Sequence, residues 1–251
     1  MMMNEVEYEK FYDQVGKVNG WNFSNVRVQS EGVKWNFYEE VTKRCTHSDI
    51  LLDVGTGGGE NVLNIASSCL FLVGVDLSHG MIKKAQSNLE ESEIQNVRFT
   101  HMSSDCLQFP NGFFDVVSCN HAPFVATEIA KVLKNGGIFL TQQVSEADKL
   151  NIKEAFGRGQ SFGEEDGTLR EAYMQELKEA GFSEVKSFEY DAIDYYERQE
   201  DILFLLTHAP IIPNFGQEER DSEIVQHFIE TNQTAKGIRT NSKRFLIIAK
   251  K

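Results

Sequence analysis

The chain has 251 residues, of which 41% are hydrophobic and 25% are charged, as in an ordinary globular domain. Asp and Glu outnumber Lys and Arg by 38 to 25, so the net charge is −13. This charge argues against a broad electrostatic grip on nucleic acid, which depends on Lys and Arg. We find no apolar run long enough to span a bilayer and no apolar core of a signal peptide in residues 1–10, so we expect a cytoplasmic protein.

Helix-like apolar spacing comes first in the chain, over residues 5–15 and 31–43. Strand and helix patterns then alternate, which predicts a mostly parallel sheet. The predicted strands are 50–54, 70–75, 97–101, 114–119, 137–143, 184–192 and 244–250, and the predicted helices are 59–67, 79–90, 124–134 and 168–180. Two further helical patterns, near 199–208 and 218–231, lie in a connection that is too long to be a turn.

The predicted topology places the long connection at one edge of the sheet. In such sheets, ligands bind outside the carboxyl ends of the strands. The strand that ends near Ala192 finishes at this edge, and an antiparallel last strand would begin there. We therefore expect a single domain over residues 1–251, in which the N-terminal segment 1–44 and the insertion 194–241 form a cap over the active-site edge.

A glycine-rich turn follows the predicted strand 50–54. Glycine has no Cβ, so the backbone can adopt positive φ and approach a ligand closely. Asp76 closes the next predicted strand, where a carboxylate can accept hydrogen bonds from both hydroxyls of a ribose. Strand, glycine turn, helix, strand and acid together predict the nucleoside-binding half of a doubly wound sheet.

Two classes of nucleoside cofactor fit this geometry. A dinucleotide fingerprint requires glycine at its first, third and sixth positions. Counted from Gly55 the sixth position is Glu60, and counting from Gly57 fails as well, which disfavours an NAD-dependent oxidoreductase. No Lys or Arg lies between Arg44 and Lys83. That absence suits a sulfonium cation, although a pyrophosphate held by backbone N–H groups would tolerate it too.

The glycine turn, with acid and glycines at Asp53, Gly55, Gly57 and Gly59, resembles the first motif of class I S-adenosylmethionine-dependent methyltransferases. Three later segments resemble further motifs of that family in the same order, and they are residues 74–81, 107–117 and 131–137. The likeness is greatest to small, type-11-like methyltransferase domains. It implies an α/β fold with a Rossmann-like, doubly wound, seven-stranded sheet whose last strand is antiparallel, a small helical cap, and S-adenosyl-L-methionine as the cofactor.

The resemblance also assigns residues to the cofactor site. They are Asp53, Gly55, Thr56, Gly57, Gly59, Asp76, Leu77, Ser104, Asp105, Asn120 and Tyr12. Many relatives have an Asp that meets the adenine amino group, whereas Ser103 stands at that position here. Ser103 and Asp105 are therefore alternatives for the adenine contact.

His121 follows the fourth predicted strand, in the loop that faces the methyl group in this family. It is the candidate catalytic residue, as a base or as a hydrogen-bonding group for the substrate, and a surface or capping histidine is the alternative. A general base is needed only if the nucleophile must lose a proton. The chain has no HExxH motif and no paired Cys/His spacing, so we predict no metal site.

We therefore expect S-adenosylmethionine-dependent methyl transfer (EC 2.1.1.-) to the O, N or C nucleophile of a small molecule, by in-line displacement. Holding the reactants in line can supply about 7–11 kcal/mol. The alternatives are an RNA methyltransferase, an NAD-dependent oxidoreductase and a non-catalytic nucleoside-binding protein. Basic residues do gather between Lys236 and Lys251, but a solvated strand flank explains them more simply.

Overall fold

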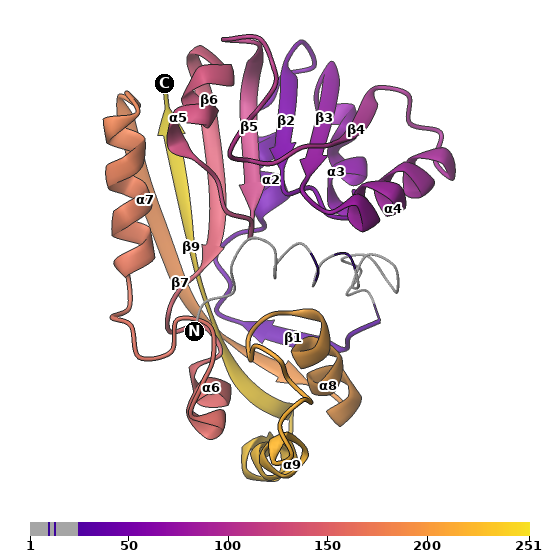
Figure 1. Ribbon diagram of the computed structural model, residues 1–251, viewed down its shortest axis with the longest axis vertical. Coiled ribbons are helices and arrows are strands. Elements are labelled where there is room, and N and C mark those ends of the chain that lie inside the picture. Colours follow the sequence, from indigo (N-terminus) through magenta and orange to yellow (C-terminus); the bar gives the residue numbers. More distant parts are fainter. Residues whose placement is uncertain (1–9, 11–12, 14–24) are drawn as a thin grey trace.

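The strands form one mixed sheet in a computed structural model that describes residues 10, 13 and 25–251. Within this part of the chain the strand order is β1-β7-β9-β6-β5-β2-β3-β4, with β8 paired to β9 (Figure 1). The strands are β1 (Val28–Glu31), β2 (Ile50–Val54), β3 (Phe71–Asp76), β4 (Val97–His101), β5 (Phe114–Asn120), β6 (Leu133–Val144), β7 (Glu184–Tyr196), β8 (Gln233–Thr234) and β9 (Gly237–Lys250).

Seven of these strands form the predicted doubly wound sheet. Strands β4, β3, β2, β5 and β6 pair in parallel, whereas β9 runs antiparallel to both β6 and β7. The predicted fold class, with an antiparallel last strand, is confirmed. The helices that flank this part of the sheet are α2 (Phe37–Thr42), α3 (Glu60–Ile65) with the 3-10 turn η1 (Ala66–Ser68), α4 (His79–Glu90), α5 (Ala126–Val132) and α7 (Thr168–Glu179).

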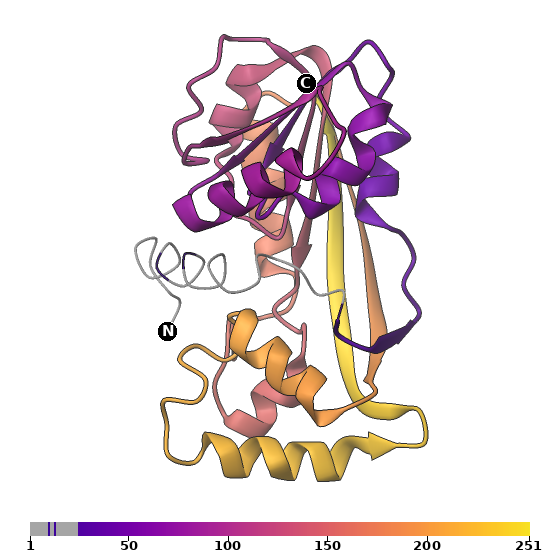
Figure 2. The same ribbon diagram turned by 90° about the vertical axis from the view of Figure 1, so that its right-hand side faces the viewer.

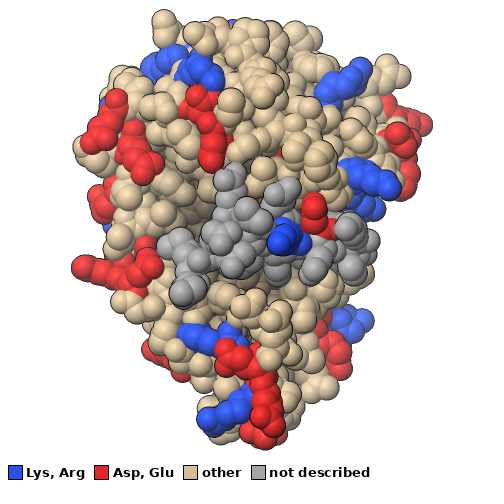
Figure 3. Space-filling view, in the orientation of Figure 1, with Lys and Arg blue, Asp and Glu red and all other residues tan. Residues whose placement is uncertain are grey.

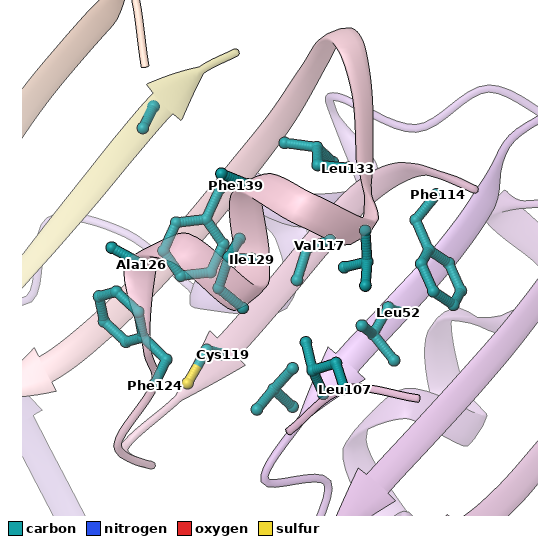
Figure 4. Close-up of a cluster of buried hydrophobic side chains, with 14 of the residues drawn as sticks. Leu52, Leu107, Phe114, Val117, Cys119, Phe124, Ala126, Ile129, Leu133 and Phe139 are labelled. Carbon is teal, nitrogen blue, oxygen red and sulfur yellow. The ribbon is translucent and has the colours of Figure 1, made fainter. Parts of the chain in front are cut away.

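Each face of the sheet has its own apolar core. On the face covered by α5 and α7, Val117 and Phe139 from the sheet pack with Phe124 and Ile129 (Figure 4). On the face covered by α2, α3 and α4, a second cluster surrounds Leu51. Burying each large apolar side chain contributes about 1.5–3 kcal/mol. Strand β5 is buried on both faces over residues 116–119.

Strands β7 and β9 extend well beyond this sheet as a paired ribbon (Figures 1 and 2). Their register runs from Glu184 opposite Lys250 to Tyr196 opposite Ile238. The sequence predicted that β9 would begin at residue 244, but it begins at Gly237. The polar residues at its start had suggested a loop, and the connection between the two strands is correspondingly shorter than predicted.

The far end of the ribbon carries a second, smaller lobe. Its helices are α6 (Leu150–Phe156), α8 (Gln199–His208) and α9 (Asp221–Asn232). They pack on the ribbon through an apolar cluster that includes Phe156, Leu206 and Phe228. This lobe lies below the main sheet in Figures 1 and 2. The sequence analysis had not predicted α6.

Of the two helices predicted before the sheet, one is partly wrong and the other lies mostly outside the described residues. The predicted helix 31–43 is wrong over its first half, because Val28–Glu31 pairs with β7 as strand β1 and α2 begins only at Phe37. Asn36 sets that start, since its side chain accepts a hydrogen bond from the Glu39 N–H. The predicted helix 5–15 lies outside the described residues except at Lys10 and Asp13. The expected cap of segments 1–44 and 194–241 stays a prediction.

Surface charge and hydropathy add two observations. On the face shown in Figure 3, acidic and basic side chains lie interspersed, and no broad basic patch is visible. None of the helices in the described part of the chain has the length and apolar character that a bilayer span requires.

Candidate functional site

The glycine turn bends the backbone back toward the neighbouring strand β3. Gly55, Gly57 and Gly59 all have positive φ, at 72°, 57° and 76°. The N–H groups of Gly55 and Thr56 both donate to the Val75 carbonyl, at 2.8 and 3.0 Å. The turn therefore lies at the carboxyl edge of the sheet, where the sequence predicted it.

Two of these glycines are also required by close packing. A Cβ on Gly55 would lie 2.2 Å from the Cβ of Ala122, and one on Gly59 would lie 2.5 Å from the ring of Phe99. Ala122 belongs to the loop after β5. The loops after β2 and β5 therefore touch at Gly55, which brings the candidate residue His121 next to the glycine turn.

Replacing Gly55 with alanine should lower the free energy of unfolding by about 2–5 kcal/mol. An alanine with positive φ costs about 1–2 kcal/mol, and forcing a methyl group into a packed site costs about 1–3 kcal/mol more. Gly136 is the matched control, because its φ is 81° and nothing lies within 4 Å of an added Cβ. Urea unfolding of Gly55→Ala and Gly136→Ala measures the loss of stability in each variant. Equal losses in the two variants would contradict the packing argument.

Asp76 stands at the end of β3 and holds the glycine turn. Its Oδ2 accepts from the Gly57 N–H and its Oδ1 from the Ser78 N–H, both at 2.9 Å. A carboxylate has about four acceptor positions, so each oxygen can accept one further hydrogen bond. Burial raises the pKa of Asp76 above its ordinary value, while these two N–H groups act in the opposite direction.

Asp13, from the N-terminal segment, lies beside this strand end. Its Oδ1 accepts from the Ser78 hydroxyl at 2.6 Å and from the Gly80 N–H at 3.1 Å. This contact attaches the segment to the start of α4. Tyr12, a predicted cofactor residue, lies outside the described residues.

Within the described part of the chain, three buried oxygen atoms around the glycine turn make no hydrogen bond of normal geometry. They are Asp53 Oδ2, Thr56 Oγ1 and Glu60 Oε1. The other oxygen of Asp53 accepts from the Ser118 hydroxyl at 2.6 Å. Buried polar atoms normally have partners, so unpaired ones next to a glycine turn point to a polar ligand or ordered water.

Burial raises the pKa of Asp53 to about 7, although the Ser118 hydroxyl acts in the opposite direction. Because this folded-state pKa exceeds the unfolded value of about 3.9, the folded protein binds more protons between these two values. The stability that the protonated carboxyl contributes is fully present below about pH 4 and is lost as the pH rises through about 7.

Asp53→Asn should therefore be more stable than the parent at pH 8, by at most about 4 kcal/mol, and should differ little from it near pH 4. The asparagine keeps an oxygen that can accept from Ser118. Urea unfolding of both proteins at several pH values from 4 to 8 measures the difference. A difference that does not grow with pH would contradict this assignment.

Asn120 is the last residue of β5, and His121 begins the loop that follows. His121 is half-buried and has a positive φ of 59°, a conformation that is uncommon for residues other than glycine. Its N–H donates to the Gln142 carbonyl at 2.8 Å. Burial, and secondly the positive charge of Arg244, lower the pKa of His121 to about 3. The ring is therefore neutral at physiological pH.

The structure adds site residues that the sequence analysis missed. Trp35 and Tyr38 reach the end of β5 from the segment around α2. Trp35 Nε1 donates to Gln142 Oε1 at 2.7 Å. Burial and the nearby carboxylate of Asp53 raise the pKa of Tyr38 well above its usual range, so its phenol remains protonated.

Polar side chains form a stripe across the sheet face that α2 covers. Strand register places them on one face, because paired residues point to the same side. We call this set the polar stripe, and it consists of Asp53, Ser118, Asn120, Gln142, Arg244, Tyr190 and Asp194. The sequence analysis did not predict this set, because its members lie on separate strands and are interrupted by apolar residues such as Leu140 and Leu246 on the same face.

The remaining predicted residues lie in or beside the loop after β4. Leu77 is half-buried, and its carbonyl lies 2.7 Å from His101 Nε2. Ser104 is half-buried and Asp105 is exposed. The Asp105 N–H donates to the Ser103 hydroxyl at 3.2 Å, so the two alternatives for the adenine contact share one turn. Which of them contacts adenine stays a prediction.

Comparison with known proteins finds similarity to methyltransferases over part of the chain. Residues 51–137 match the family model described as a methyltransferase domain. A Bacillus subtilis protein named uncharacterized methyltransferase YcgJ is 32% identical over 146 residues, which cover 55% of this chain and 54% of that protein. The demethylmenaquinone methyltransferase of Lactococcus lactis is 28% identical over 116 residues, which cover 42% of this chain and 46% of that protein. The chain thus spans about half the length of these curated relatives.

Solved structures extend the likeness of the fold over most of the chain. The crystal structure of YcgJ from Bacillus subtilis has a TM-score of 0.62 and 20% identity, and the match covers 85% of this chain and 97% of that one. The crystal structure of the [4+2]-cyclase SpnF has a TM-score of 0.61 and 16% identity, and the match covers 98% of this chain and 96% of that one. At such identities the likeness concerns the fold alone, and the chemistry must be argued from the site.

Proposed function

We propose that this chain, whose residues 51–137 match a methyltransferase domain, is a class I S-adenosylmethionine-dependent methyltransferase and transfers a methyl group to a small-molecule acceptor. The observation that carries the proposal is the Asp76 carboxylate held against the Gly57 N–H at the carboxyl edge of a parallel sheet. That arrangement leaves acceptor positions on the carboxylate for the two hydroxyls of a ribose.

The residues around the glycine turn suit S-adenosylmethionine. The positive φ of Gly55, Gly57 and Gly59 turns the backbone at the carboxyl edge of the sheet, and Thr56 is buried there with a hydroxyl that has no partner among the described residues. The unpaired oxygens of Asp53 and Glu60 can accept hydrogen bonds from an ammonium group. Leu77, together with Ser104 or Asp105, would enclose the adenine, and Tyr12 would cover the cofactor.

Bound S-adenosylmethionine supplies an electrophilic methyl group on a sulfonium that is already a good leaving group. The protein then has to orient an acceptor and exclude water, which can be worth about 7–11 kcal/mol. Asn120 and His121 are placed to do this, because the contact between Gly55 and Ala122 holds their loop against the glycine turn. His121 is neutral and weakly basic, which favours a hydrogen-bonding role over proton abstraction.

We propose that the acceptor enters between the two lobes, where the polar stripe lies and where the segments 1–44 and 194–241 would form a cap. A small-molecule acceptor is favoured over RNA by the net charge of −13 and by the mixed surface charge in Figure 3.

Calorimetric titration tests this function directly. The purified protein should bind S-adenosylmethionine and S-adenosylhomocysteine, and it should not bind NAD under the same conditions. Release of methyl groups to a panel of small metabolites then separates an enzyme from a nucleoside-binding protein. Binding of NAD alone would overturn the proposal.

A further inference from the structure

Trp35 fixes the direction of a hydrogen-bond network at the end of β5. Its indole N–H lies 2.7 Å from one amide atom of Gln142. An indole N–H can only donate, so that amide atom must be the oxygen. The other amide atom of Gln142 is therefore the NH2 group, and this assignment follows from chemistry alone.

The Gln142 NH2 group fixes its two neighbours in turn. It lies 3.0 Å from Asn120 Oδ1 and 3.2 Å from His121 Nε2. Because Gln142 uses one N–H for each contact, the Nε2 atom of His121 has to accept. A neutral imidazole has one N–H, so the proton of His121 is on Nδ1.

Among residues 10, 13 and 25–251, the Nδ1–H group of His121 has no hydrogen-bond partner, although the atom is buried. Leaving a buried donor unpaired costs about 1–3 kcal/mol, and such a group at a functional site calls for a ligand. Arg244 acts on the ring of His121 through its positive charge, but its guanidinium is paired with the Asp148 carboxylate. The unpaired N–H group itself calls for an oxygen that accepts a hydrogen bond.

We propose that Trp35 is a positioning residue, which acts through Gln142 to present His121 as a hydrogen-bond donor from Nδ1 to an oxygen of the methyl acceptor. This inference rests on the proposed methyltransferase function. It narrows the acceptor class to compounds that offer a hydrogen-bond-accepting oxygen beside the methylated atom. It also gives His121 the task of orienting the acceptor, because an Nδ1 atom that carries the proton cannot remove another.

Nitrogen NMR of histidine-labelled protein at pH 7 tests the tautomer. The chain has six histidines, and His121→Gln identifies the His121 signals by their loss. The parent should show a protonated Nδ1 and an unprotonated Nε2. Gln142→Glu should reverse this pattern, because its carboxylate can only accept. Trp35→Phe, which keeps an aromatic ring facing Tyr190, should give a mixture of the two tautomers.

Tyr190→Phe is the matched control. It removes the hydroxyl from the ring that packs on Trp35 at a centroid distance of 4.6 Å, and it leaves the indole N–H in place. Its His121 signals should match the parent. A proton on Nε2 in the parent, or Trp35→Phe signals identical to the parent's, would overturn the proposal.

Benzoate and benzylamine probe the acceptor class, because they share a ring and differ in the sign and hydrogen bonding of the attached group. Benzoate should shift the His121 Nδ1 signal more than benzylamine does, because its oxygens accept hydrogen bonds, and an equal or reversed effect would overturn the assignment of an oxygen acceptor. The tautomer measurement needs no cofactor. Calorimetry with S-adenosylhomocysteine therefore tells failure of the proposed function apart from failure of this inference.

Discussion

Asp76→Ala should weaken the binding of S-adenosylhomocysteine by about 10²–10⁴-fold. A hydrogen bond to a charged group contributes about 1.5–3 kcal/mol, and we expect two such bonds to ribose hydroxyls. Their loss of about 3–6 kcal/mol corresponds to this range at 1.4 kcal/mol for each tenfold change. The variant also loses the acceptor that holds the Gly57 N–H, which adds to the effect. Isothermal titration calorimetry measures the change.

Asp115→Ala is the matched control for this experiment. Asp115 is also a strand carboxylate, but it lies at the amino end of β5, where it accepts from the Ile50 N–H at 2.9 Å and pairs with Lys134. Its loss should lower stability while leaving the affinity for S-adenosylhomocysteine within a few-fold of the parent's. If Asp76→Ala bound the ligand as tightly as Asp115→Ala does, the assignment of the cofactor site would be wrong.

Asp194→Leu should destabilise the folded protein by about 3–5 kcal/mol. Asp194 Oδ2 pairs with Lys149 Nζ at 2.6 Å, and the two side chains are only 10% and 2% exposed. Burial tends to raise the pKa of Asp194, but Lys149 lowers it below the ordinary value. Removing the carboxylate leaves a buried ammonium without its counter-charge, and breaking such a pair costs about 3–5 kcal/mol. Urea unfolding measures the loss.

The double variant Lys149→Met/Asp194→Leu separates this cause from general damage. Replacing both partners of a buried pair with apolar residues is often neutral or stabilising, so the double variant should recover most of the lost stability. Glu31→Ala provides an exposed comparison, because Glu31 pairs with Lys236 while both side chains are more than half exposed. It should cost about 0–1 kcal/mol. A double variant no more stable than Asp194→Leu would refute the unpaired-charge explanation.

The position of the glycine turn and of Asp76 in the fold could be predicted because their signals are local. A strand, a glycine turn and an acid lie within about thirty residues, so their order along the chain already specifies their order in space. The structure bears out the resulting fold. It places Asp76 against Gly57 across only 19 positions of sequence.

The rest of the site could not be predicted, because its contacts join distant parts of the chain. Trp35 and Gln142 are 107 positions apart, and Asp148 and Arg244 are 96 apart. No pattern in a single sequence reports such pairs. The polar residues of β9, Thr240 and Ser242 among them, are buried by the lobe that packs on the ribbon. Before that packing is known, alternating polar residues of this kind suggest an exposed loop.

The β7–β9 ribbon has a consequence for how the site can open. Its two strands pass without interruption from the main sheet into the smaller lobe, bonded along their length from Glu184 to Tyr196. Sliding one lobe past the other would break that ladder, whereas a gentle flexing of the ribbon would keep it intact. A large ligand would therefore enter through a hinge motion of the small lobe. Restricting this motion would slow ligand entry and release without changing the residues that contact the ligand.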